Sequence, residues 1–126
     1  MSTTVGDLEH EARVILQDTD ESNYRFTPYV LFCGIRDGLK RLYSARPESR
    51  YFGLALVSAT FPAVASDMDS AAITAARAAL VLIEERWFEA VIYYAVHKAY
   101  LIDSSDTANA QLAAYYLSKF EGIART

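Results

Sequence analysis

The sequence predicts a mainly α-helical fold, a small antiparallel bundle of about four helices with a short extended or β element in the middle of the chain. Three observations predict it. Apolar residues recur at helical spacing towards both ends, short polar turns join the expected helices, and residues 51–66 carry no charge. Because 126 residues suit one core, residues 1–126 are expected to form a single domain, with residues 51–83 as a variable, partly extended segment.

Composition limits the possible classes of protein. A hydrophobic content of 52% with 22% charged residues argues against a disordered chain, and the net charge of −4 argues against a general nucleic-acid binder. The single cysteine leaves no partner for an intramolecular disulfide. Neither a secretory signal nor an apolar run long enough to span a membrane is evident, so we expect a soluble intracellular protein.

The first expected helix covers residues 5–17, because Leu8, Ala12 and Leu16 recur on one helical face. The polar run 17–23 ends it and predicts a loop.

The second helix has the clearest start, with Thr27 as its N-cap and Pro28 in its first turn. Gly34 and Gly38 lie one turn apart inside it. They indicate either a close contact with another helix or glycines that the packing tolerates. Pro47 ends the segment.

The middle of the chain is ambiguous. Pro62 interrupts the apolar stretch that begins at Tyr51, so a long strand is not expected there. Residues 73–83 fit a helical face, yet their apolar run from Leu80 to Ile83 also fits a short strand. Extended chain up to about residue 83 is the favoured interpretation.

Two further helices are expected, over residues 84–103 and from about residue 107 to Phe120, with Gly122 as a C-terminal stop. The first is apolar nearly all round, which predicts either a central position or cover by partner subunits. The candidate core residues are Leu31, Ile35, Leu39, Trp87, Val91, Tyr94, Leu112 and Tyr116.

No motif predicts catalysis, a metal site or a cofactor. His10 lies among acids and is expected to be solvated, His97 to be packed or at an interface, and Cys33 to be a small buried hydrophobe. Glu85 and Glu89 with Arg86 predict a surface charge cluster.

The basic cluster of the second helix extends beyond its end and comprises Arg36, Lys40, Arg41, Arg46 and Arg50. It indicates a solvated face or subunit salt bridges more than a phosphate site. The nine tyrosines suit either protein–protein contact or aromatic filling of the core.

The order of these features resembles the small head–tail connector proteins, also called adaptor or neck proteins, of tailed bacteriophages. The resemblance covers both ends of the chain and leaves residues 51–75 unmatched. It rests on the segments Ile15–Asp20, Arg25–Pro28, Leu42–Pro47, Glu85–Val91 and His97–Tyr100, followed by Asp103, Asp106, Asn109, Tyr115 and Phe120.

This resemblance implies a structural virion protein that is not an enzyme and needs no cofactor. Such proteins form rings, usually dodecamers, that dock beneath the portal protein, extend the DNA channel and bridge to the next neck or tail protein. Double-stranded DNA passes through without sequence-specific binding. The implied location is the virion neck, with assembly in the host cytoplasm, and no membrane is involved.

Two alternatives remain at this stage. A small helical DNA-binding regulator would use the basic cluster, although the polar linker at residues 17–26 is too long for a helix-turn-helix. An enzyme would need a perturbed acid or His97 in a pocket. The candidate interface is the uncharged segment, through Tyr51, Phe52, Leu54, Leu56, Val57 and Phe61, unless that segment folds back over the helices.

Overall fold

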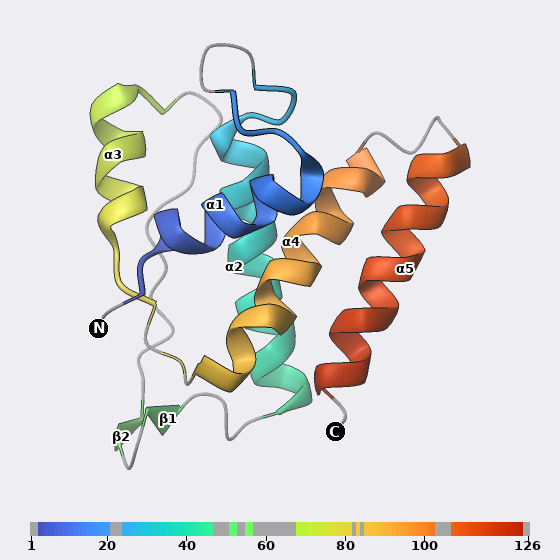
Figure 1. Ribbon diagram of the computed structural model, residues 1–126. Helices are drawn as coiled ribbons and strands as arrows, with labels where there is room; N and C mark the ends of the chain where they lie inside the picture. The colour runs from blue at the N-terminus through green and yellow to red at the C-terminus, as the bar shows by residue number, and fades with distance from the viewer. Residues whose placement is uncertain are drawn as a thin grey trace.

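The protein is mainly helical, with five α-helices in the described part of the chain (Figure 1). The computed structural model describes residues 3–20, 24–46, 51–52, 55–56, 68–81, 83, 85–102 and 107–124. Helix α4 (Phe88–Ile102) is central and packs against α5 (Thr107–Ala124), α2 (Pro28–Ala45) and α1 (Val5–Leu16). A central position was one of the two alternatives that the sequence pattern predicted, since α4 has apolar residues on nearly every face.

Local signals set the ends of α1. The Thr4 hydroxyl accepts from the backbone N–H of Asp7 at 3.2 Å, and the Asp7 carboxylate accepts from the Thr4 N–H at 2.9 Å, which makes a capping box. After Leu16, Gln17 adopts a left-handed conformation with φ of 56° and ends the helix. The first helix thus ends within one residue of its predicted boundary.

Helix α2 begins where the sequence predicts. The Thr27 hydroxyl accepts from the Val30 N–H at 3.4 Å, and Pro28 occupies the first turn. The apolar stripe of Leu31, Ile35 and Leu39 is buried against the core.

The two glycines of α2 mark a close contact with α4. A Cβ atom added to Gly34 would lie 2.9 Å from Ala95 Cα, and one added to Gly38 would lie 3.2 Å from Tyr94 Cβ. Of the two interpretations that the spacing allowed, close helix–helix approach is therefore correct. The absent side chains let the backbones of α2 and α4 come together.

We expect Gly34→Ala to destabilise the fold by about 1–3 kcal/mol, because the added methyl group would press on the backbone of α4. Gly122→Ala is the matched control, since a Cβ at Gly122 would meet nothing within 4 Å. That control should be neutral or gain up to about 1 kcal/mol through helix propensity. Urea unfolding followed by circular dichroism measures both. Equal effects of the two substitutions would contradict the close contact.

The favoured interpretation of residues 73–83 is wrong for their first half. Residues Ser70–Ala78 form helix α3, capped by the Asp69 carboxylate, which accepts from the Ala72 N–H at 2.8 Å. Beyond it the chain is extended, and Leu80 makes an antiparallel bridge with Thr4. The segment divides at Ala79 because the alanine-rich first half favours a helix, whereas the second half pairs with the chain that enters α1.

The backbone of Tyr51–Phe52 (β1) pairs antiparallel with that of Ala55–Leu56 (β2). The side chains of the candidate interface, Tyr51, Phe52, Leu54, Leu56, Val57 and Phe61, lie outside the described part of the structure.

At the C-terminal side, a single 3₁₀ turn, Glu85–Trp87 (η2), leads into α4, and α5 runs antiparallel to α4 (Figure 1). Helix α5 continues to Ala124, so the expected stop at Gly122 is wrong. Gly122 lies inside the last turn of the helix. Within the described residues, no helix combines the length and the apolar character that a membrane span requires.

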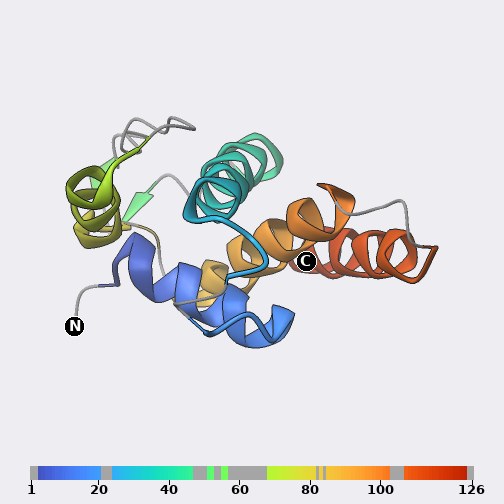
Figure 2. The ribbon, with the colours of Figure 1, turned by 90° about the horizontal axis from the view of Figure 1, so that it is seen from above.

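The core surrounds α4 and is completed by the inner faces of α1, α2 and α5. Leu31, Ile35 and Val91 are fully buried, and Leu39, Trp87 and Tyr94 are at most 8% exposed. The remaining two candidates, Leu112 and Tyr116 of α5, are only half-buried. They lie at the edge of the core because α5 packs on one side of α4 and has solvent on its other side (Figure 2).

Candidate functional site

The residues that the sequence analysis considered as candidates for catalysis or metal binding lie apart from one another. His10 is exposed, Cys33 is half-buried, and His97 is buried with its Nδ1 atom 2.7 Å from the carbonyl oxygen of Ala113. His97 is therefore a packed histidine that joins α4 to α5. Among the described residues, no three His, Cys, Asp or Glu side chains gather closely enough to hold a metal ion.

The predicted surface charge cluster is at the surface. Glu85, Arg86 and Glu89 are all exposed around the start of α4, and the Arg86 guanidinium lies 4.7 Å from the centre of the Trp87 ring. The guanidinium covers the buried indole from the solvent side.

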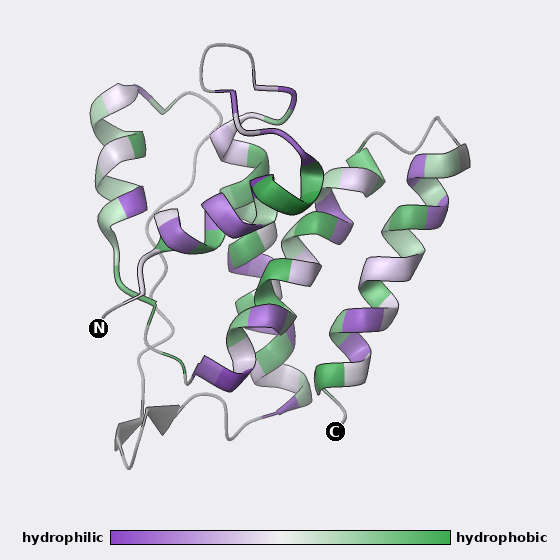
Figure 3. Ribbon diagram, in the orientation of Figure 1, coloured by the Kyte–Doolittle hydropathy of each residue, from purple (hydrophilic) through white to green (hydrophobic). Residues whose placement is uncertain are grey.

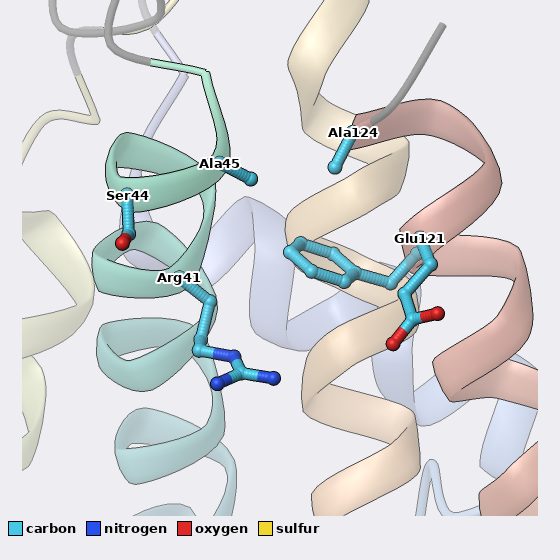
Figure 4. A pocket seen from close by; sticks show the side chains of 6 residues that line it. Arg41, Ser44, Ala45, Glu121 and Ala124 are labelled. Atoms are coloured by element: carbon cyan, nitrogen blue, oxygen red, sulfur yellow. The ribbon is translucent and has the colours of Figure 1, made fainter.

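The basic cluster does not form one continuous surface of unpaired cations. Arg36 pairs with Asp37 at 3.2 Å, and the Arg46 guanidinium donates to the carbonyl oxygen of Ala124. Lys40 and Arg41 are exposed, and Arg50 lies outside the described residues. Arg41 and Glu121 lie on opposite sides of a pocket of about 190 Å³ between the ends of α2 and α5 (Figure 4).

A buried ion network forms a feature that the sequence analysis missed. The Arg13 guanidinium donates to Glu9 Oε2 at 2.9 and 3.0 Å, to Asp18 Oδ2 at 2.9 Å and to the Phe26 carbonyl oxygen at 2.9 Å. The side chains of Arg13, Glu9 and Asp18 are each at most 5% exposed. Such burial is tolerated because each charge has partners of opposite sign and several hydrogen bonds.

The same network fixes two neighbouring segments. The Asp18 carboxylate accepts from the backbone N–H groups of Arg25 and Phe26, at 2.7 and 2.9 Å, which positions the chain that enters α2. On the other side, Arg77 of α3 donates to the Glu9 carboxylate at 2.6 and 3.0 Å. The network therefore connects α1, α3 and the start of α2, and we assign it a structural role.

The tyrosines lie mostly between α4 and α5. Tyr116 stacks on Tyr100 with ring centres 6.0 Å apart and also contacts Tyr93 and Tyr115. Burial is the main cause that raises the pKa of Tyr116, and the neighbouring phenols raise it further. The Lys119 ammonium lies 5.4 and 5.2 Å from the ring centres of Tyr93 and Tyr115. Most of the cluster is therefore packing, and Tyr115, at 52% exposed, is its surface edge.

The best candidate for a functional surface is a groove of about 320 Å³ between α2 and α4. We call it the α2–α4 groove. It collects three of the large hydrophobic residues that are exposed in the described chain, namely Tyr29 at 38%, Leu101 at 48% and Ile102 at 66%. Its lining residues are Tyr29, Val30, Cys33, Gly34, Arg36, Asp37, Lys98, Leu101 and Ile102.

The α2–α4 groove also has a charged edge with one excess positive charge. Asp37 pairs with Arg36 at 3.2 Å and lies 3.8 Å from the Lys98 ammonium, so two cations share one carboxylate. Along the α2 side, a hydrogen bond with Cys33 raises the pKa of the Tyr29 phenol. An apolar groove with a weakly positive edge suits docking of a chain segment that carries an acid.

Sequence reasoning placed none of these residues in a groove. The helical pattern places Leu101 and Ile102 on apolar faces of the central helix, for which both burial and cover by partner subunits were expected alternatives. Both residues are exposed in the last turn, where the end of α4 is coloured hydrophobic in Figure 3. The apolar pattern continues to the last turn of α4. No sequence signal near that turn indicates that the neighbouring helices leave it uncovered.

A scan against models of protein families found no match, and searches of curated proteins and of solved structures found none either.

Proposed function

We propose that the chain is a ring-forming structural protein that acts as a head–tail connector in a tailed bacteriophage. In this proposal it docks beneath the portal protein, extends the DNA channel and bridges to the next neck or tail protein. It works in the virion neck after assembly in the host cytoplasm. The resemblance of its two ends to connector proteins suggests this role, and the α2–α4 groove is the observation that carries it.

The groove supports assembly for a physical reason. Ile102 and Leu101 expose about half or more of their surface at one place, next to Tyr29. Burial of apolar surface gains roughly 25 cal/mol per Å², so a partner that covers this groove stabilises the complex. Monomeric proteins rarely expose large clusters of hydrophobic residues, and such clusters commonly mark an interaction site.

The charges are compatible with a channel through which DNA slides. A basic surface binds DNA tightly because its cations displace the counterions of the phosphates. This chain has a net charge of −4, so it lacks the general basic surplus that would hold the duplex. Arg36 and Arg46 of the basic cluster are engaged with Asp37 and with the end of α5. This favours a structural role over the alternative of a small DNA-binding regulator.

The short extended element in the middle of the chain belongs to this proposal too. We propose that residues 51–66 contact a neighbouring subunit or the next neck protein, because the segment is uncharged. Cross-linking of the assembled protein with photoreactive groups at Phe52 or Phe61 tests this. Cross-links within single chains alone would assign the segment to the monomer core.

The experiment that tests the proposed function measures mass and shape. Native mass spectrometry and negative-stain microscopy over a concentration series should give closed rings, near a dodecamer of the 14.0 kDa chain. A salt series of gel shifts with duplex DNA, run in parallel, should give no shifted band at physiological salt. A protein that stays monomeric throughout and shifts duplex DNA would support the regulator instead.

A further inference from the structure

We infer that the ring closes through one heterologous contact, in which the outer face of α1 of one copy docks into the α2–α4 groove of the next. This inference rests on the proposed function, because it names the surfaces that a self-assembling ring would use. Its basis is a match in charge and polarity between two surfaces that the described chain leaves uncovered.

The acceptor is the α2–α4 groove. Its apolar part is formed by Leu101 and Ile102 of α4 beside Tyr29 of α2. At its edge, Arg36 and Lys98 share the carboxylate of Asp37, which leaves one positive charge in excess. The matching segment should therefore carry an exposed apolar side chain and an acid within one helical turn.

The outer face of α1 meets this requirement. Glu11 and Val14 are three residues apart on its exposed face, and Val14 is 49% exposed. Asp7 lies one turn before Glu11 on the same face, where it completes the capping box. In Figure 3 the visible face of α1 changes from hydrophilic to hydrophobic colours towards its C-terminal end. Among the described residues, Glu11 takes part in no ion pair, so its carboxylate is available to the groove.

The remaining exposed hydrophobic side chains suit the groove less well. Tyr115 lies beside the Lys119 ammonium, which would face the excess positive charge of the groove. Leu80 is 54% exposed, but its backbone is paired with Thr4. Val14 therefore has the best combination of exposure and neighbouring acid.

The placement of the two surfaces suits a ring. Figure 2 shows α1 and α2 on opposite sides of α4, so the donor and acceptor surfaces are different parts of one molecule. A contact between two different surfaces is heterologous, and repeated copies close into a ring when the rotation between them permits it. A two-fold dimer, by contrast, would use the same surface twice.

Charge reversal tests the contact. We expect Glu11→Lys and Lys98→Glu each to raise the concentration needed for ring assembly by about tenfold or more, because each places like charges together. An equimolar mixture of the two singly substituted proteins should recover assembly, since an alternating ring has opposite charges at every contact. The double substitution in one chain should recover it as well.

Two controls separate this contact from general effects. Lys40→Glu makes the same charge change at an exposed position of α2 outside the groove and should leave assembly unchanged. Ile102→Asp places a charge at an exposed position in the apolar part of the α2–α4 groove and should weaken assembly. An equimolar mixture of this variant with the Lys98→Glu protein should not recover assembly. Thermal unfolding of each variant at low concentration checks that the subunit is folded.

The outcomes distinguish the two proposals. Rings that form equally well with Glu11→Lys, Lys98→Glu and Ile102→Asp would overturn the inferred contact and leave the proposed function standing. Loss of assembly that neither the mixture nor the double substitution rescues would also overturn the pairing of Glu11 with Lys98. A wild-type protein that never assembles would overturn the proposed function and the contact together.

Discussion

Arg13→Ala should be strongly destabilising, with an expected loss of about 3–5 kcal/mol in the free energy of unfolding. The Arg13 side chain is 3% exposed, and its guanidinium holds Glu9, Asp18 and the Phe26 carbonyl oxygen. Its removal leaves the carboxylate of Asp18 buried without its cation. It also leaves Glu9 with Arg77 as its one remaining cation among the described residues. Domains of this size are stable by about 5–15 kcal/mol, so the loss is a large fraction of the total.

Chemical unfolding followed by circular dichroism measures this effect, and Arg77→Ala is the matched control. Arg77 binds the same carboxylate of Glu9, but its side chain is 34% exposed. An ion pair open to solvent contributes roughly 1 kcal/mol or less, so the control should be mild. Equal losses for the two arginines would mean that burial does not set the strength of this network.

The elements that local chemistry determines could be predicted from the sequence. Thr27 and Pro28 make a cap that depends on adjacent residues alone, and α2 begins there. Apolar residues on nearly every face predicted either a central place or partner cover for α4, and in the structure α1, α2 and α5 pack against it. Glycines one turn apart suggested a close helix contact as one of two interpretations. The structure was needed to identify Ala95 as the residue that Gly34 approaches.

The features that were missed depend on residues far apart in the chain. Glu9 and Arg13 have the spacing of a helical ion pair, but Arg77, which completes the network, is 68 residues from Glu9. Helix α3, Ser70–Ala78, was missed because residues 73–83 were assigned to one extended element. The pairing of Leu80 with Thr4, which is tertiary, holds the second part extended.

The exposed groove was missed for a related reason. Leu101 and Ile102 follow the apolar pattern of α4, and a pattern predicts which residues share a face. Whether a neighbour covers that face depends on where α2 and α5 end, which is a property of the whole fold. An uncovered turn of an otherwise buried helix therefore appears only when the helices are assembled.

Trp87→Ala should cost about 3–5 kcal/mol, because it removes the largest side chain at the start of the central helix. Trp87 is 6% exposed and belongs to the core cluster that also contains Val91 and Tyr94. The Trp87 Nε1 atom is buried and has no hydrogen-bond partner among the described residues. The indole therefore stabilises the fold through its buried area and its contact with the Arg86 guanidinium, whereas its N–H group is a cost.

Trp87→Phe tests this interpretation, because it keeps most of the aromatic area and removes the buried N–H group. The smaller ring loses contacts but relieves the unpaired donor, so the net cost should be about 1 kcal/mol or less. Urea unfolding monitored by circular dichroism suits both variants, since Trp87 is the only tryptophan and neither variant retains its fluorescence. A loss with Trp87→Phe as large as that with Trp87→Ala would show that the indole N–H is engaged in the folded protein. A negligible loss with Trp87→Ala would instead contradict the docking of η2 and the first turn of α4 against the core.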